Sequence, residues 1–240
     1  RSPYSMRILH YRTERGVIDG ALIVFADASR LVEYETRPAI ILPASNACIR
    51  TFLDAARQLI REAPARGLTV EQFMKSFQGR LQALTAGYEL SIRANWGSVA
   101  LSLIVQSALE GYAGRNSKRL SITGPKLFLP PTQTLALVMV MHELADNAAR
   151  HGSLSQRGGK IHVSWNVARI KGRDLLRIDW LESAGPKVTR PQKTGLGRKL
   201  IDEAVKSELR GTIAIDYAPP GVKVQLSMPI KVREDARAGR

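Results

Sequence analysis

An apolar run that leads into a row of polar side chains is the feature that most constrains the fold of this chain. Residues 135–140 would form a helix with no polar face, and such a helix is buried. Polar side chains then follow at spacings of four and of seven or eight residues, on one side of the helix: Glu143, Asn147, Arg150 and His151. Polar groups left unpaired in a buried place cost roughly 1–3 kcal/mol each. We interpret the row as a site whose partners are a ligand and a metal ion; the alternative is a solvated face with ordinary surface ion pairs.

The overall composition limits the class of protein. At 240 residues, with 44% hydrophobic and 24% charged residues, the chain is typical of a soluble globular protein with one large or two small domains. No apolar stretch approaches the roughly 20 residues that span a bilayer, so we expect no membrane span and a cytoplasmic location. The single cysteine, Cys48, fits a reducing compartment. Because the chain opens on Arg1, we take it to be a piece of a longer protein.

The net charge of +15, from 36 basic and 21 acidic side chains, permits binding to nucleic acid, anionic lipid or an acidic protein. The basic residues are scattered, however, and no recognition-helix or RNA-binding motif accompanies them. We therefore keep nucleic-acid binding only as a minor hypothesis. A steep salt dependence of binding to DNA would support it.

The first part of the chain predicts a strand pair followed by a helical hairpin. Residues 6–29 indicate two strands around a turn near residues 15–20, and residues 30–44 indicate a linker. A first helix is expected from Ser45 or Asn46, either of which is a good N-cap. A second is expected from the capping-box pattern of residues 69–72, with an apolar stripe at helical spacing: Phe73, Phe77, Leu81 and Leu84. Two such hairpins would bury their stripes in a four-helix bundle, so we expect a homodimer.

From about Trp96 the pattern changes to interspersed helices and strands. Besides the buried helix, helices are predicted at residues 101–112 and 197–209, and strands at residues 119–123, 161–167, 176–180, 213–217 and 222–228. Strands arranged mostly as a meander with helices between them are typical of a layered sandwich. The predicted fold class is therefore α+β, a helical hairpin followed by an α/β sandwich domain.

A carboxylate at the end of a predicted strand is the second indication of a site. Leu176, Ile178 and Trp180 share the face of the strand that points to the core, and Glu182 continues that face. A buried carboxylate has to be paired or hydrogen-bonded, and an amino group on a nucleotide base would satisfy Glu182. The alternative is a glutamate at the end of the strand that turns to solvent.

A glycine-rich turn before a helix is the third indication. Gly195 and Gly197 run directly into Arg198 and Lys199. Glycines let the backbone approach a ligand closely, and the amide groups at a helix N-terminus bind phosphate. Basic residues in the first turn interact unfavourably with the helix dipole, at a cost of about 0.3–1 kcal/mol each. A bound polyphosphate would turn this cost into a gain. A lone Gly-x-Gly is usually only a loop, but beside the glutamate strand and the polar helix it becomes strong evidence.

These motifs together resemble the HWE family of bacterial histidine kinases. Residues 142–155 (HELADNAARHGSLS) resemble the family's N box, residues 180–186 its Trp-x-Glu motif, and residues 195–201 its second glycine box. Residues 46–90 resemble the family's dimerisation and phosphoacceptor hairpin, with residues 77–84 as the best match. The strand pair at residues 6–29 resembles the end of a PAS sensor domain.

The resemblance implies an ATP-binding domain of the GHKL type, with ATP and Mg²⁺ as cofactors. Asn147 would hold the Mg²⁺ that bridges the phosphates, Glu143 would orient or deprotonate the group that is phosphorylated, and Glu182 would contact adenine. His142, beside Glu143, is counted with the catalytic residues. The remaining nucleotide-binding candidates are Arg150, His151, Gly185, Gly195, Gly197 and Lys199.

Three positions depart from the family pattern. Asp146 stands where a threonine is usual and brings negative charge close to the expected metal site, and Ala184 replaces a glycine. Asn46 falls at the position of the phosphoacceptor histidine, and asparagine cannot accept a phosphoryl group as imidazole does. No histidine lies between residues 11 and 141 to take its place.

The sequence therefore predicts the transmitter region of a two-component histidine kinase that binds Mg-ATP, with a response regulator receiver domain as partner and with autophosphorylation in doubt. The expected divisions are a PAS-like end at residues 1–35, the hairpin at 36–93, the ATP-binding domain at 94–232 and a polar tail at 233–240. The alternative is a non-catalytic dimerisation or regulator-docking module with a vestigial nucleotide site.

Overall fold

The computed structural model describes residues 4–12, 18–27, 57, 69–114, 118–170, 172–189 and 195–230. The chain divides into two compact units, Arg1–Pro43 and Ala44–Arg240. In the first unit, β1 (Tyr4–Arg12) pairs antiparallel with β2 (Ile18–Asp27), which confirms the two predicted strands. The expected turn is placed too late, since Gly20 already lies in β2, opposite Tyr11. That this strand pair ends a PAS domain remains a prediction.

Helix α2 (Val70–Arg93) is the second helix of the predicted hairpin. Thr69 is its N-cap, and both hydrogen bonds of the capping box are present between Thr69 and Gln72, at 3.1 and 3.2 Å. This confirms the predicted start of the helix, because the box satisfies two backbone amides that the first turn would otherwise leave unpaired. The linker and the expected first helix, including Asn46, lie outside the described residues apart from the helical Arg57.

The buried face of α2 differs from the predicted apolar stripe. Leu81 is 43% exposed, whereas the buried residues are three small ones and a cation: Arg80, Ala83, Gly87 and Ser91. Phe73 and Phe77 do pack, against Leu200. Leu81 does not belong to the face that packs on α4, because α2 meets this neighbour through small side chains, which let two helices approach closely. Burial of the apolar stripe in a four-helix bundle stays a prediction.

Helix α4 (Pro131–Arg150) is the centre of the second unit. Every residue from 134 to 145 is buried, as the absence of a polar face predicts. Proline at the first helical position starts the helix without losing a hydrogen bond. Helix α3 (Leu101–Ala113) packs on α4 along one side, and α2 packs along another. A short pair, β3 (Val99–Ala100) with β5 (Phe128–Leu129), ties the starts of α3 and α4 together.

The sheet has five strands: β4 (Leu120–Thr123), β6 (Lys160–Ile170), β7 (Arg173–Ser183), β8 (Thr212–Ala218) and β9 (Gly221–Pro229). Their order is β4-β6-β7-β9-β8, with β4 parallel to β6 and the other pairs antiparallel. The predicted strands are all present, but the meander is broken where β9 lies between β7 and β8. Helix α5 (Leu196–Glu203), continued by the π-helical turn η2 (Ala204–Glu208), carries the chain from β7 to the edge strand β8.

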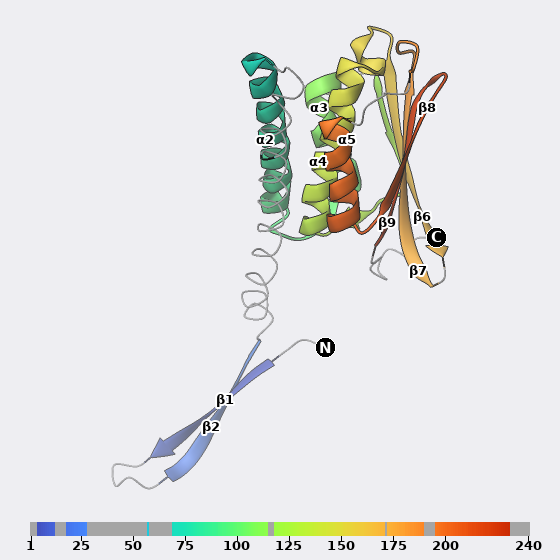
Figure 1. The fold of residues 1–240 in the computed structure, drawn as a ribbon. Coiled ribbons are helices and arrows are strands. Elements are labelled where there is room, and N and C mark those ends of the chain that lie inside the picture. Colours follow the sequence, from blue (N-terminus) through green and yellow to red (C-terminus); the bar gives the residue numbers. More distant parts are fainter. Residues whose placement is uncertain are drawn as a thin grey trace. The chain divides into compact units, whose positions relative to one another are not determined.

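The helices α3, α4 and α5 form a layer on one face of the sheet, with α2 outside them (Figure 1). The inward row of β7 is buried as predicted, and Trp180 is among the largest fully buried side chains. The α/β sandwich is thus confirmed, and its core lies between α4 and the strands β6, β7 and β9. Among the residues that the structure describes, no helix is long and apolar enough to cross a membrane.

Candidate functional site

A cavity of about 540 Å³ opens at the C-terminal end of α4. Its walls come from α2, α4, the end of β7, the start of α5, and strands β8 and β9. Eight of the residues singled out in the sequence line it: Glu143, Asn147, Arg150, His151, Glu182, Gly185, Gly195 and Gly197. Three motifs that are far apart in the sequence therefore meet around one space.

Two of the candidates do not line this cavity. Lys199 is exposed in the first turn of α5, and its neighbour Arg198 lines the cavity in its place. Arg198 also forms an ion pair with Asp202 at 2.9 Å. His142 faces a second cavity, on the side of α4 towards α2 and α3.

The start of α5 touches the polar row of α4. A Cβ atom at Gly197 would lie 2.7 Å from Glu143 Oε2 and 3.7 Å from Asn147 Nδ2. No ordinary Cβ atom approaches an oxygen that closely, so the turn needs glycine here in order to pack on Glu143. The glycine box and the polar helix, which the sequence marked separately, are in direct contact.

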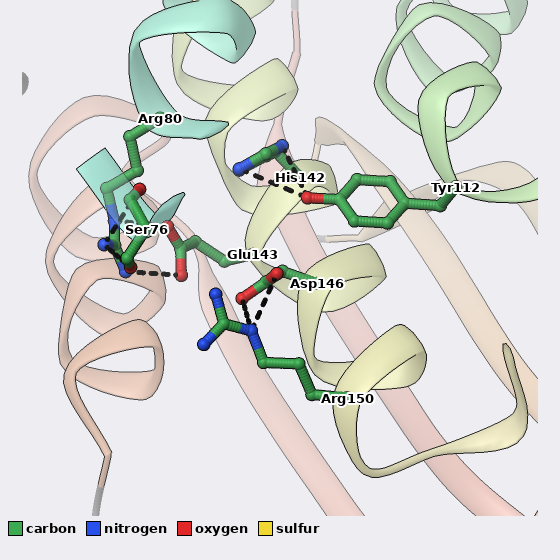
Figure 2. A network of polar contacts seen from close by, with 7 residues as sticks. All are labelled: Ser76, Arg80, Tyr112, His142, Glu143, Asp146 and Arg150. Atoms are coloured by element: carbon green, nitrogen blue, oxygen red, sulfur yellow. Dashed lines mark hydrogen bonds and ion pairs between the residues drawn. The ribbon is translucent and has the colours of Figure 1, made fainter. Parts of the chain in front are cut away.

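Glu143 is only 3% exposed, and its partner comes from α2. Arg80 Nε lies 2.7 Å from Glu143 Oε1, and Arg80 Nη2 donates to Oε2 at 3.1 Å (Figure 2). Burial raises the pKa of Glu143 above its ordinary value, and the charge and hydrogen bond of Arg80 act in the opposite direction. Arg80 is therefore a partner of this carboxylate that the sequence analysis did not foresee, and a contact of Glu143 with a ligand or a metal stays a prediction.

Arg80 is the site residue that the sequence analysis missed. It lies within residues 77–84, the segment that resembles the family's hairpin most closely, but nothing in the local pattern pairs it with a residue 63 positions away. The available signal was a charged residue between Phe77 and Leu84 on an otherwise inward helix face. A cation in that place needs an anion on the helix that covers it.

Glu182 is held by donors close to it on the same side of the sheet. Its Oε2 accepts a hydrogen bond from the backbone amide of Ser153 at 2.7 Å, and its Oε1 accepts one from the indole of Trp180 at 3.2 Å. The carboxylate is buried, so the alternative of a glutamate that turns to solvent is excluded. A Cβ atom at Gly152 would lie 2.2 Å from Oε2, which shows how closely the turn after α4 wraps this side chain.

His142 lies in a second cavity of about 380 Å³ between α2, α3 and α4. Its Nδ1 is 3.1 Å from the hydroxyl of Tyr112 (Figure 2). Gly79 of α2 packs on its ring. Burial lowers the pKa of His142 to about 4, so the imidazole is neutral at neutral pH. Its place fits a contact between helices, whereas Glu143 borders both cavities.

Asp146, the departure from the family's threonine, already has a partner. Arg150 lies one turn further along α4 and its Nε is 2.8 Å from Asp146 Oδ2 (Figure 2). The extra negative charge is therefore balanced within the helix. Ala184, the second departure, adopts a φ of 54°, the left-handed region that glycine enters without strain.

The chain is similar in sequence to histidine kinases. Residues 53–126 match the family model described as HWE histidine kinase. A blue-light-activated histidine kinase of Brucella ovis is 30% identical over 160 residues, which make up 67% of this chain and 33% of that protein. The protein of the same name from Brucella anthropi is 31% identical over 154 residues, 64% of this chain and 31% of that protein. The chain thus spans about a third of the length of the curated relatives it matches.

Solved structures show the same fold. The histidine kinase domain of the Erythrobacter litoralis EL346 blue-light activated histidine kinase has a TM-score of 0.50 at 16% identity, over 82% of this chain and 99% of that one. A longer structure of the same kinase has a TM-score of 0.54 at 15% identity, over 78% of this chain and 59% of that one. At these identities the likeness supports the fold alone. The sequence matches show that the chain is related to the HWE histidine kinases, with residues 53–126 matching the family itself.

Proposed function

We propose that this chain is the transmitter region of a histidine kinase and binds Mg-ATP in the 540 Å³ cavity. The observation that carries the proposal is the contact of Gly197 with Glu143 and Asn147 in a cavity whose wall also holds the buried Glu182. The volume lies within the roughly 300–1,000 Å³ typical of small-molecule sites. A polar end near α5 and a carboxylate near the sheet match the two chemically different ends of a nucleotide.

Adenine is the proposed neighbour of Glu182. A carboxylate has about four lone-pair positions, and the two contacts from Ser153 and Trp180 leave capacity for one more donor. The exocyclic amino group of adenine is such a donor. Gly185, which follows β7, would let the base come close to the strand end.

The phosphates are proposed to lie at the start of α5, near Asn147. Gly195 is the N-cap of this helix and has no side-chain cap, so the first-turn amides of α5 are available to anionic oxygens. Within the described residues no group of three or more His, Cys, Asp or Glu side chains could hold a metal ion. Mg²⁺ would therefore bind together with the nucleotide, through the amide oxygen of Asn147 and phosphate oxygens.

Bound ATP would supply the transferable phosphoryl group, and the residues of the chain would position it. Glu143 is proposed to orient or deprotonate the acceptor, while Arg150 and His151 add charge or donors at the cavity wall. Such positioning and charge neutralisation account for most of enzymatic phosphoryl transfer. Since the proposed substrate is ATP, the corresponding location is the cytoplasm.

The proposed partners are a second copy of the chain and the receiver domain of a response regulator. An exposed apolar stripe runs along α2, at a spacing suited to a helical bundle: Val70, Met74, Leu81, Tyr88 and Ile92. We assign residues 36–93 to the dimerisation hairpin, 94–232 to the ATP-binding domain and 1–35 to a PAS-like end. Asn46 at the acceptor position favours a kinase that does not phosphorylate itself there, and it equally favours the alternative of a docking module with a vestigial nucleotide site.

The proposal is tested with the Asn147→Ala variant. Asn147 is exposed, so its loss should change the free energy of unfolding by no more than about 0.5 kcal/mol. Calorimetric titration should show that wild type binds ATP in Mg²⁺ and that the variant loses the Mg²⁺-dependent part of the affinity. Asn166→Ala, an exposed asparagine on β6, is the matched control and should bind as wild type does.

The same experiment separates the two functions. If wild type does not bind Mg-ATP, the docking module with a vestigial site takes the place of the kinase. If it binds, labelling of an Asn46→His variant with γ-labelled ATP then decides whether only the acceptor has been lost. Unchanged binding by Asn147→Ala would remove this residue from the site.

A further inference from the structure

Helix α2 supplies one wall of the cavity proposed for the nucleotide. Gln72, Ser76 and Arg80 lie one turn apart along the helix, and all three line the cavity. Arg80 also lines the second cavity, so it stands in the partition between the two. The hairpin helix is therefore part of the site, and Arg80 is the residue through which it reaches deepest.

The side chain of Arg80 is fixed at both ends of its guanidinium group. Nε and Nη2 contact the two oxygens of Glu143, and Nη1 donates to Ser76 Oγ at 2.6 Å. On its other side the carboxylate of Glu143 abuts the backbone of Gly197. Glu143 is thus held between α2 and the first turn of α5, by a cation on one side and by the glycine box on the other.

We propose that Arg80 is a positioning residue for the phosphoryl-transfer site, which holds the carboxylate of Glu143 as an anion against Gly197. This inference rests on the role proposed above for Glu143. An anionic carboxylate in a fixed place can accept a proton or a hydrogen bond from an incoming acceptor group. A protonated one cannot accept the proton.

The charged and titratable groups around Glu143 make Arg80 decisive. On α4 the neighbours are Asp146, which opposes ionisation of Glu143, and Arg150, which favours it but is already paired with Asp146. His142 on the same helix is neutral at neutral pH. From α5 the backbone of Gly197 approaches, and Arg198, which lines the same cavity, is paired with Asp202. From α3 comes the hydroxyl of Tyr112, whose pKa is raised by burial, so that it is uncharged at neutral pH. Arg80, from α2, offsets the burial of Glu143 through both its charge and its hydrogen bond.

The placement links the hairpin to the chemistry. Arg80 belongs to α2, whereas Glu143 belongs to α4, so a displacement of α2 would change the environment of the carboxylate while the cavity residues on α4 and β7 stay in place. A single buried cation couples the position of α2 to Glu143 more directly than many surface contacts would.

The experiment compares Arg80→Met, Arg80→Gln and Arg80→Lys with wild type. Arg93→Met is the matched control, because Arg93 lies on the same helix but is exposed and pairs with its neighbour Glu89. The titration of Glu143 is followed by carboxyl carbon NMR, with Glu143→Gln to assign its signal. The midpoint should rise by at least one pH unit in Arg80→Met and Arg80→Gln, by less in Arg80→Lys, and not at all in Arg93→Met.

A midpoint that is the same in all four proteins would overturn the proposal. If Arg80→Met fails to fold, the midpoints of the other proteins decide the proposal in the same way: the midpoint should rise from wild type to Arg80→Lys and again to Arg80→Gln. This readout needs no nucleotide, so it can succeed or fail independently of ATP binding. If the Asn46→His variant accepts label, Arg80→Met in that background should slow labelling at pH 7 at least tenfold when Mg-ATP is saturating; an equal rate would contradict the positioning role.

Discussion

The two ends of the cavity each hold a buried glutamate, and the two are kept in place in different ways. Glu182 lies at the end of β7, and its partners are a backbone amide and the indole of Trp180, two residues before it in the strand. Glu143 lies on α4, and its partner is Arg80, on a helix 63 residues earlier in the chain. One carboxylate is stabilised by neutral donors within the sandwich, the other by a full charge from the hairpin.

This difference determines which of the two glutamates can respond to a movement of α2. Donors from the backbone and from a fully buried tryptophan cannot move without disrupting the core, so the environment of Glu182 is as rigid as the sheet. The environment of Glu143 depends on how α2 packs on α4. We therefore expect Glu182 to bind adenine in a fixed geometry and the environment of Glu143 to change with the position of α2.

The largest effect should come from breaking the ion pair on one side only. Glu143→Leu leaves the Arg80 cation buried without its partner, which typically costs about 3–5 kcal/mol. Arg80→Met combined with Glu143→Leu removes both charges and should restore much of the loss, because a buried ion pair replaced by apolar groups is often neutral. Urea unfolding of the single and double variants measures this coupling. Strictly additive losses would mean that the two residues do not act as a pair.

The next effect concerns His142 and appears as a dependence on pH. Burial lowers its pKa from 6.5 to about 4, so the unfolded chain binds a proton at higher pH than the folded one does. The resulting stability is present above pH 6.5 and is lost as the pH falls towards 4, with a total of about 3 kcal/mol.

This dependence is checked by difference. His142→Gln removes the titrating group, so the free energy of unfolding of wild type minus that of the variant should decrease between pH 6.5 and 4. Parallel curves for the two proteins over that range would show that His142 does not carry the dependence.

A smaller loss is expected at the other glutamate. Glu182→Gln turns one charge-assisted acceptor into an amide, so at least one of the bonds from Ser153 and Trp180 weakens, at about 2 kcal/mol. Unlike the loss at Glu143, this one should not be recovered by changing Arg80. In the double variant Glu182→Gln with Arg80→Met, additive losses of unfolding free energy would support the independence of the two ends. A coupling of more than about 1 kcal/mol would contradict it.

The smallest effect is a gain. Ala184 follows β7 two residues after Glu182 and has a φ of 54°, which costs a residue with a Cβ atom roughly 1 kcal/mol. Ala184→Gly should stabilise the protein by up to that amount, in thermal or urea unfolding. The control is Ala214→Gly, at an exposed position in β8, which should destabilise by roughly 0.5–1 kcal/mol. A loss in both variants would refute the strain at Ala184.

Local signals predicted the elements well. The capping box at Thr69 marked the start of α2, because its hydrogen bonds connect residues three apart. The alternation of β7 placed Glu182 on the inner face, since the side-chain period of a strand continues to its last residue. The unbroken apolar run of α4 predicted a buried helix whose next turns carry a site.

Contacts between residues far apart in the sequence could not be predicted in the same way. Leu81 is apolar and well spaced, yet it faces outward, because α2 presents its small residues to α4. The strand order β7-β9-β8 depends on where the chain returns after α5, which no local pattern encodes. His142 sits in the N box, but its ring points to Tyr112 and not into the larger cavity.

Local patterns in the sequence were enough to predict the family resemblance, the sandwich and the residue types of the candidate site, because helix caps, side-chain periods and glycine turns act over a few residues. Which of these residues meet depends on how the elements pack. Only the packing of α2 on α4 joins Arg80 to Glu143, and only the return of α5 brings Gly197 onto that carboxylate. A periodic pattern states which side of an element is buried, but the partner that buries it is set by how all the elements pack at once.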